Sequence, residues 1–283
     1  MTIDKRFDVP DLGCGVGLRI PHYEHIFAER PEVDFFEIIS ENFMVAGGRP
    51  KKNLERALET YPIVQHGVSL GIGAPTPLDF DYLAQLKALA KQTGTPWVTD
   101  HLCWTRAGGH DLHDLLPMPY TEEAVRHVAE RVRIVQDYLE LPLGLENTSS
   151  YLTYTTSTLS EQDFLRAIAE EADCALLLDV NNVYVSAQNH GFSAEAFIDA
   201  LPHHRVIQFH LAGHTDKGKY ILDTHSDFVR DEVWALYRRA IRRTGPVTTL
   251  VEWDAEIPSF EVVHGEALKA QAIREEVARE RAA

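Results

Sequence analysis

Ala175-Leu176-Leu177-Leu178-Asp179-Val180-Asn181-Asn182 places a carboxylate directly after a short apolar run. Similar runs that end in a His, Asp or Glu recur at 64–67 (VQHG), 98–101 (VTDH), 144–147 (GLEN), 207–210 (IQFH) and 250–253 (LVEW). Short β-type runs with little polar alternation are typical of the buried strands of a parallel sheet. The six runs therefore predict strands that each carry a polar side chain near the carboxyl end.

Two further runs, 13–18 and 35–40, bring the number of expected strands to eight. The full set is 13–18, 35–40, 63–69, 97–101, 143–147, 175–179, 206–210 and 248–253. Helical patterns separate many of them, at 78–92, 121–139, 161–171, 194–200, 227–243 and 259–282. Thr121 and Ser160 are candidate N-caps, and Gly94 and Gly245 are candidate C-caps.

Eight strands that alternate with helices predict an α/β fold with a single (β/α)8 barrel over residues 1–283. Its core is expected over about 12–261, with a C-terminal helix at 259–282. An open doubly wound sheet is the alternative, but no Gly-x-Gly-x-x-Gly turn follows a strand. The segment 109–114 is expected to form a long loop across the barrel mouth.

The composition narrows the classes of partner. The chain has 27 Lys and Arg residues and 43 Asp and Glu residues, which gives a formal net charge of -16. This charge disfavours a protein that binds nucleic acid mainly through its phosphates. The longest apolar runs fall far short of the roughly 20 residues that a membrane span needs. No secretory signal is visible at the N-terminus, and three widely spaced cysteines make no disulfide framework. We therefore expect a cytoplasmic protein with neither a nucleic-acid nor a membrane partner.

The polar strand ends indicate chemistry at one face of the barrel, because the active site of this fold lies where its strands end. Carboxylates gathered that densely should repel one another and raise their pKa values unless cations neutralise them. His, Asp and Glu without thiolate suit iron, manganese or zinc. With the loop Asp223-Thr224-His225, about eight or nine candidate ligands exceed the needs of one ion, so we expect two or three.

Seven segments add a more specific signal: 13–19 (GCGVGLR), 37–43 (EIISENF), 66–70 (HGVSL), 99–102 (TDHL), 146–147 (EN), 179–182 (DVNN) and 210–214 (HLAGH). Over roughly 12–261 the chain resembles the multinuclear non-heme iron-dependent oxidative enzymes. The resemblance implies a barrel similar to xylose isomerases and endonuclease-IV-type enzymes. It also implies two or three iron ions, mixed Fe(II) and Fe(III), with O2 as co-substrate. The implied substrate is a ribosomally synthesised precursor peptide, modified most often at cysteine and recruited by a small partner protein.

The resemblance also assigns ligands. It groups His66, His101, Glu146 and Glu252 on one side of the cluster, Asp179 and His210 with a shared Glu146 in the middle, and Asn182, Asp223 and His225 at a more labile position. Asp254 is a candidate for proton transfer, with a plain loop acid as the alternative. His214 is a candidate catalytic group, facing substrate or supporting a ligand.

Two other functions stay open on the same residues. One is a zinc or manganese phosphodiesterase or sugar isomerase on the same barrel, which the fold alone does not exclude. Asn182 disfavours it, because endonuclease-like barrels usually have a His at that position. The other is a binding module with a structural metal, which is disfavoured by the size of the ligand set. A homodimer is compatible with the sequence, but no feature demonstrates one.

Overall fold

A computed structural model describes residues 5–108 and 110–282. In this part of the chain, eight parallel strands close a barrel in the order β1-β12-β9-β8-β7-β4-β3-β2. They are β1 (Cys14–Gly17), β2 (Phe36–Ile39), β3 (Ile63–Gly67), β4 (Val98–His101), β7 (Leu143–Glu146), β8 (Ala175–Asp179), β9 (Val206–Leu211) and β12 (Thr248–Val251). Each coincides with an expected strand, so the predicted (β/α)8 barrel is confirmed.

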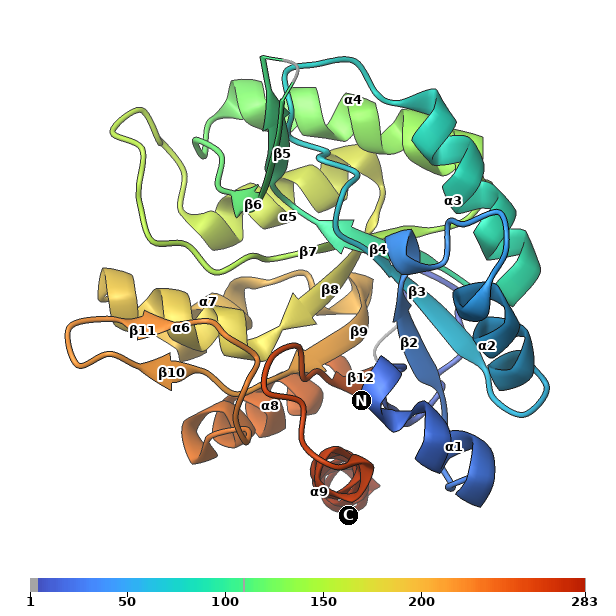
Figure 1. Ribbon diagram of the computed structural model, residues 1–283. Helices are drawn as coiled ribbons and strands as arrows, with labels where there is room; N and C mark the ends of the chain where they lie inside the picture. The colour runs from blue at the N-terminus through green and yellow to red at the C-terminus, as the bar shows by residue number, and fades with distance from the viewer. Residues whose placement is uncertain (1–4, 109, 283) are drawn as a thin grey trace.

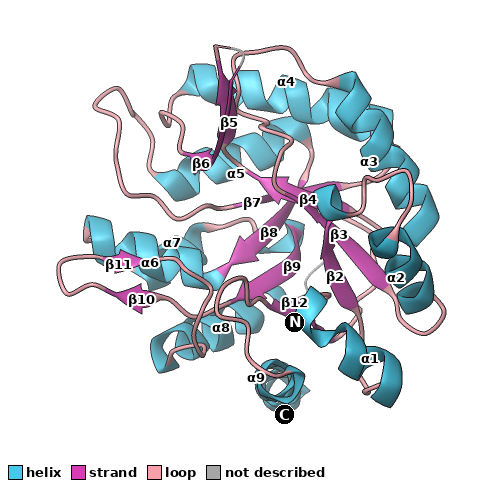
Figure 2. Ribbon diagram, viewed as in Figure 1, coloured by secondary structure: helices cyan, strands magenta, loops and turns pink. Residues whose placement is uncertain are grey.

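Helices surround this barrel (Figures 1 and 2). They are α1 (Tyr23–Glu29), α2 (Arg49–Leu58), α3 (Phe80–Thr93), α4 (Glu122–Leu139), α5 (Glu161–Ala172), α6 (Val180–His190), α7 (Ala194–Ala200), α8 (Asp231–Thr244) and α9 (Phe260–Ala282). The expected caps are present: Thr121 Oγ1 accepts from the Ala124 amide, and Ser160 Oγ accepts from the Asp163 amide. Gly94 ends α3 in the left-handed conformation. Among the described helices, none combines the length and apolar composition that a membrane crossing requires.

Two hairpins stand outside the barrel sheet. The segment 109–114, expected as a long loop, belongs to the first, β5 (Trp104–Ala107) paired antiparallel with β6 (His110–Leu116). Residues 110–114 are therefore part of a strand within the connection from β4 to α4; Gly108, at φ 57°, lies between the two strands, and Gly109 lies outside the described residues. The second hairpin joins β10 (Thr215–Asp216) to β11 (Ile221–Leu222).

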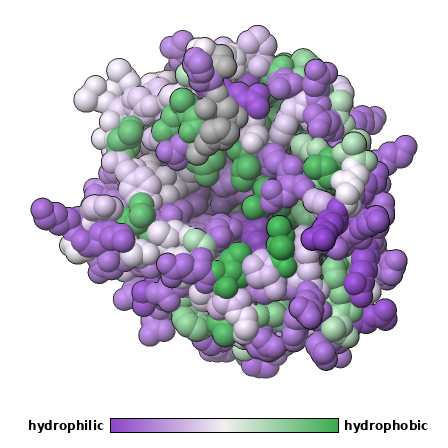
Figure 3. Space-filling view, in the orientation of Figure 1, coloured by the Kyte–Doolittle hydropathy of each residue, from purple (hydrophilic) through white to green (hydrophobic). Residues whose placement is uncertain are grey.

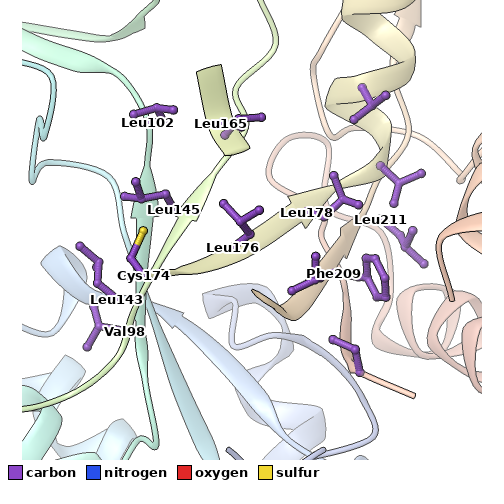
Figure 4. Packing of buried hydrophobic residues seen from close by; sticks show 14 of the residues in the cluster. Val98, Leu102, Leu143, Leu145, Leu165, Cys174, Leu176, Leu178, Phe209 and Leu211 are labelled. Carbon is purple, nitrogen blue, oxygen red and sulfur yellow. The ribbon is translucent and has the colours of Figure 1, made fainter. Parts of the chain in front are cut away.

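Side-chain alternation divides the barrel strands between two environments. One set packs between the sheet and the helices, as Leu145, Leu176 and Leu178 do in the large cluster of Figure 4. A separate small cluster comprises Phe35, Val64, Trp97, Ala175, Ile207 and Leu250. Its members alternate with the outward set, so they fill the barrel interior near the amino ends of the strands. Polar side chains occupy the other half of the barrel interior, near the carboxyl ends of the strands.

Candidate metal centre

The polar half of the barrel interior holds seven side chains with metal-binding atoms. All are buried, and each lies in a barrel strand or directly after one: Glu37, His66, His101, Glu146, Asp179, His210 and Glu252. Parallel strands bring their carboxyl ends to the same face of a barrel, which explains why residues so distant in sequence meet here. The sequence-predicted strand ends therefore converge on one site.

Glu146 lies at the centre of three histidines. Its Oε2 is 3.2 Å from His66 Nε2 and 3.3 Å from His101 Nε2, and its Oε1 is 3.5 Å from His210 Nδ1. Burial alone would raise the pKa of Glu146, but the three imidazoles outweigh burial and lower it to about 2. Carboxylate repulsion, expected from the sequence, does not dominate at this position.

Glu252 and His225 form the other end of the cluster. Glu252 Oε2 lies 3.1 Å from His210 Nδ1 and 3.2 Å from His225 Nδ1, while His225 Nε2 lies 2.8 Å from Asp223 Oδ1. Burial would lower the pKa of His225, but the nearby carboxylates, Asp223 first, hold it well above its usual range. His225 has a left-handed backbone at φ 44°, which is uncommon for a residue with a side chain.

Asp179 shows the behaviour that the sequence predicted for every carboxylate. Burial raises its pKa well above the usual range, and the attraction of His225, 3.7 Å away, does not compensate. Its Oδ1 accepts from the Asn182 amide at 2.6 Å and so caps α6, which begins directly after β8. Its buried Oδ2 has no hydrogen-bond partner among the described residues.

Unpartnered buried atoms are concentrated in this cluster. Within the described residues, those that lack a hydrogen bond of acceptable geometry include both carboxylate oxygens of Glu146, Asp179 Oδ2, Asn182 Oδ1, His210 Nδ1 and His225 Nε2. A buried polar atom left without a partner costs about 1–3 kcal/mol, and more when charged. Bound cations would satisfy all of these atoms at once, so the residues present fit a metal centre.

The donor atoms fall into four overlapping groups, each within 4.8 Å. The groups are Glu37, His66 and His210; His66, His101 and Glu146; Glu146, Asp179 and His210; and Asp179, His225 and Glu252. Four residues belong to two groups each, which is the arrangement expected of bridged ions. Glu252 groups with Asp179 and His225, whereas the family resemblance placed it with His66 and His101.

Hydrogen bonds at one nitrogen of each ring orient the histidines. His66 Nδ1 lies 2.9 Å from Thr99 Oγ1, His101 Nδ1 lies 3.1 Å from the Gly67 carbonyl, and His210 Nε2 lies 3.2 Å from Glu37 Oε2. In each ring the second nitrogen is thereby directed towards Glu146. Such contacts fix the ring orientation of metal-binding histidines in proteins.

A cavity of about 630 Å³ opens above the cluster. His66, His101, Asn182, Asp223, His225, Glu252 and Asp254 all contribute to its lining. Figure 3 shows a hollow with a hydrophilic floor near the centre of this face. Glu146, Asp179 and His210 are not among the lining residues and lie deeper in the barrel.

Asp254 lies at the edge of this cavity and is 40% exposed. Its Oδ2 is 3.2 Å from His225 Nδ1, and its Oδ1 accepts a hydrogen bond from the Arg19 guanidinium. Arg19 also donates to Glu252 Oε1 at 3.2 Å and to the Trp253 carbonyl at 3.3 Å. One buried cation therefore holds three consecutive residues in place.

His214 does not line the cavity. Its Nδ1 lies 2.8 Å from Asn181 Oδ1, and Asn181 Nδ2 in turn donates to Asp223 Oδ1 at 2.8 Å. The His214 ring packs against Tyr184, with the centroids 5.1 Å apart. His214 is thereby linked to Asp223 through Asn181.

A family model described as "RiPP precursor modification enzyme MbnB/TglH/ChrH" matches residues 13–275. The chain belongs to this family. A UPF0276 protein of Anaeromyxobacter sp. (strain Fw109-5) is 52% identical over 247 residues, covering 87% of each chain. A UPF0276 protein of Caulobacter vibrioides is 49% identical over 253 residues, covering 89% of this chain and 90% of its own length.

The MbnB/TglH/ChrH family member also resembles solved barrels at low identity. D-psicose 3-epimerase from Clostridium cellulolyticum H10 has a TM-score of 0.60 at 13% identity, with 92% of this chain and 95% of that chain covered. Endonuclease IV from Thermus thermophilus has a TM-score of 0.57 at 15% identity, with coverages of 94% and 100%. These similarities show the xylose-isomerase-like barrel fold and carry no activity to this chain.

Sequence reasoning missed two residues of this RiPP enzyme's site. Glu37 is bonded to His210, and Arg19 is bonded to Glu252 and Asp254. Both lie in the quoted segments 13–19 and 37–43. Glu37 stands between Phe36 and Ile38 within its strand instead of at its end, so a search for polar strand ends passes over it. The alternation of buried strand residues is the signal that finds it.

Proposed function

We propose that this protein is a multinuclear non-heme iron-dependent oxidative enzyme that uses O2 to modify a ribosomally synthesised peptide, most often at cysteine. The family match supports the peptide substrate. The observation that carries the proposal is the set of overlapping donor groups with unpartnered buried atoms. A donor set of imidazole and carboxylate suits iron, and its size exceeds what one ion uses.

The donor groups suggest which residues would hold each ion. We assign His66, His101 and Glu146 to one ion, and His210, Asp179 and a shared Glu146 to a second. Asp179, His225 and Glu252 would hold a third, with Asn182 and Asp223 beside it. Bound iron would supply O2 activation and would acidify a substrate thiol that binds to it.

The protein's own thiols support a substrate thiol as the ligand. Cys14, Cys103 and Cys174 are all buried, and none lines the central cavity. Burial raises the pKa of Cys103 well above its usual range, although Cys103 is only two residues from His101. The described donor groups therefore contain no thiolate that would compete with a cysteine of the peptide.

Asp254 is the residue placed to move a proton. It is the most exposed carboxylate of the Arg19–Glu252–His225 network, and it lies where a bound substrate would enter. Arg19 would orient its carboxylate, so that Oδ2 can accept a proton from the substrate. Leu115, Leu116 and Pro117 line the other side of the cavity and would exclude water from it.

Metal analysis of anaerobically purified protein tests the proposal. We expect more than one iron per chain, and loss of iron in Glu146→Gln. Asp114→Asn is the matched control, because Asp114 lines the same cavity but belongs to none of the described donor groups. A single zinc ion that supports full activity would contradict the iron assignment.

Addition of a cysteine-containing precursor peptide without oxygen provides a second test. A thiolate-to-Fe(III) charge-transfer band should appear, and admission of O2 should then change the mass of the peptide. The same band and mass change with a Cys→Ser peptide would exclude thiol chemistry. Turnover of a phosphodiester or a free sugar in place of any peptide would favour the hydrolase or isomerase alternative.

A further inference from the structure

The segment 147–160, between β7 and α5, presents an apolar pair at the barrel mouth. It contains no helix or strand, yet hydrogen bonds fix it on both sides of the pair: the Ser150 amide donates to Ser186 Oγ at 3.2 Å, and Tyr154 OH donates to the Pro117 carbonyl at 3.1 Å. Between these anchors, Tyr151 and Leu152 are each 48% exposed. Figure 1 shows the segment in yellow-green, extending between the β5–β6 and β10–β11 hairpins.

Three cavities meet at Leu152. The first is the central cavity of about 630 Å³. A second, of about 520 Å³, lies between Leu152, Asn189 and Tyr220. A third, of about 270 Å³, lies between Leu152, Tyr120 and Phe192. Leu152 lines all three, so the two outer cavities adjoin the one above the metal-binding residues. We call the two outer cavities, with Leu152 between them, the Leu152 groove.

The Leu152 groove has the surface of a binding site. Tyr151, Leu152, Phe192 and Tyr220 are large apolar side chains at least 36% exposed, and all four line it. Exposed apolar side chains clustered in this way mark surfaces that bind another molecule. The third cavity is smaller than the roughly 300 Å³ at which small-molecule pockets begin, so it fits one side chain of a longer ligand better than a free metabolite.

We propose that the peptide modified in the central cavity lies across Leu152 and places an apolar side chain, close to the modified residue, in the third cavity. This rests on the proposed function for its occupant, a peptide whose reacting residue is above the metal-binding cluster. The position of the groove beside the central cavity, on the other side of Leu152, favours that occupant over a second copy of the chain. The anchored backbone on both sides of Leu152 presents the groove without a cost of ordering it.

A binding selection with a matched pair of variants tests this proposal. The probe is a library of short synthetic peptides, each with one central cysteine, selected without oxygen on the metal-loaded protein. The selected peptides should share an apolar residue at a fixed distance from the cysteine. Leu152→Asp should weaken their binding by about tenfold or more, since it removes the burial of an apolar side chain. Leu268→Asp is the control, because Leu268 is 56% exposed on α9 and lines none of the three cavities.

A charge swap separates a lost contact from a damaged fold. Peptides in which the shared apolar residue is replaced by Lys should bind Leu152→Asp better than they bind the unchanged protein, and both proteins should hold the same metal. Equal binding of the selected peptides to Leu152→Asp and Leu268→Asp would overturn the proposal, as would a library from which nothing is enriched. Leu152-dependent binding without any oxygen-dependent change in peptide mass would retain the groove and refute the oxidative function.

Discussion

Replacing Glu146 by Gln in the metal-free protein should lower the free energy of unfolding. In that state Glu146 faces three histidines, which hold its pKa near 2 against an ordinary 4.5. The difference corresponds to at most about 3 kcal/mol, at about 1.4 kcal/mol per pK unit, since burial lowers the pKa of His101 and leaves that ring uncharged at neutral pH. A lowered pKa stabilises the fold above pH 4.5, and this contribution is lost as the pH falls towards 2. Gln keeps the shape of the side chain but removes the charge.

Asp179→Asn should have the opposite effect in the same protein. The pKa of Asp179 is raised because burial penalises its charge, so the ionised carboxylate destabilises the metal-free fold at neutral pH. Asn keeps an oxygen for the Asn182 amide and therefore keeps the cap of α6. We expect Asp179→Asn to be more stable than the unchanged protein without metal, although both variants should bind metal poorly.

Urea unfolding of chelator-treated protein at pH 7 measures both effects. Glu146→Gln should unfold at a lower urea concentration, Asp179→Asn at a higher one, and Asp114→Asn, at the rim, close to the unchanged protein. For a chain of this length, a loss of about 3 kcal/mol also corresponds to a fall in Tm of roughly 5 °C. If Glu146→Gln were as stable as the unchanged protein, pairing with the histidines would not be what stabilises this carboxylate.

Three further predictions concern residues outside the donor groups. Arg19→Met should release Asp254 and reduce turnover by about tenfold or more, while iron at His66, His101 and Glu146, which Arg19 does not contact, stays bound; metal analysis beside kinetics checks this, and complete loss of iron would contradict it. Burial raises the pKa of the Cys14 thiol to about 12, so no alkylation should occur at pH 8 until guanidinium unfolds the chain. Gly213→Ala should destabilise strongly, because a Cβ there would lie 2.1 Å from the Asp227 carbonyl oxygen, whereas Gly47→Ala, with open space around it, should melt like the unchanged protein.

The sequence predicted the barrel because strand periodicity is a local property of the chain. The predicted strand 175–179 matches β8 at both ends, and the others differ by a few residues at most. The positions of His66, Glu146 and Asp179 at strand ends followed from the same pattern. In a parallel barrel, the position of a residue along its strand determines how close its side chain lies to the carboxyl-end face. Residues at the carboxyl ends of different strands could therefore be predicted to lie together without knowledge of any distance.

The sequence could not predict which charged side chains lie next to one another in the site. The expected rise in carboxylate pKa occurs at Asp179, where burial is its main cause, but not at Glu146, because histidines from three other strands surround that carboxylate. Helix α6 was also missed. The run Asp179-Val180-Asn181-Asn182 has the appearance of a loop, but Asp179 ends β8 and caps α6 at the same time, with no connecting residue.

The direct junction of β8 with α6 limits where residues can be inserted into this protein. At Asp179 one residue ends a strand, begins a helix and faces the donor cluster, so an insertion there would displace all three functions together. The neighbouring connection at 147–160 has fourteen residues without regular structure. Its first part is bonded to the site, Asn147 to Asp179 and Ser149 to Asp223, whereas Tyr154 is bonded to the Pro117 carbonyl. New recognition can therefore be engineered by exchanging residues 152–160, while the first part of the connection and the strands keep the reaction centre unchanged.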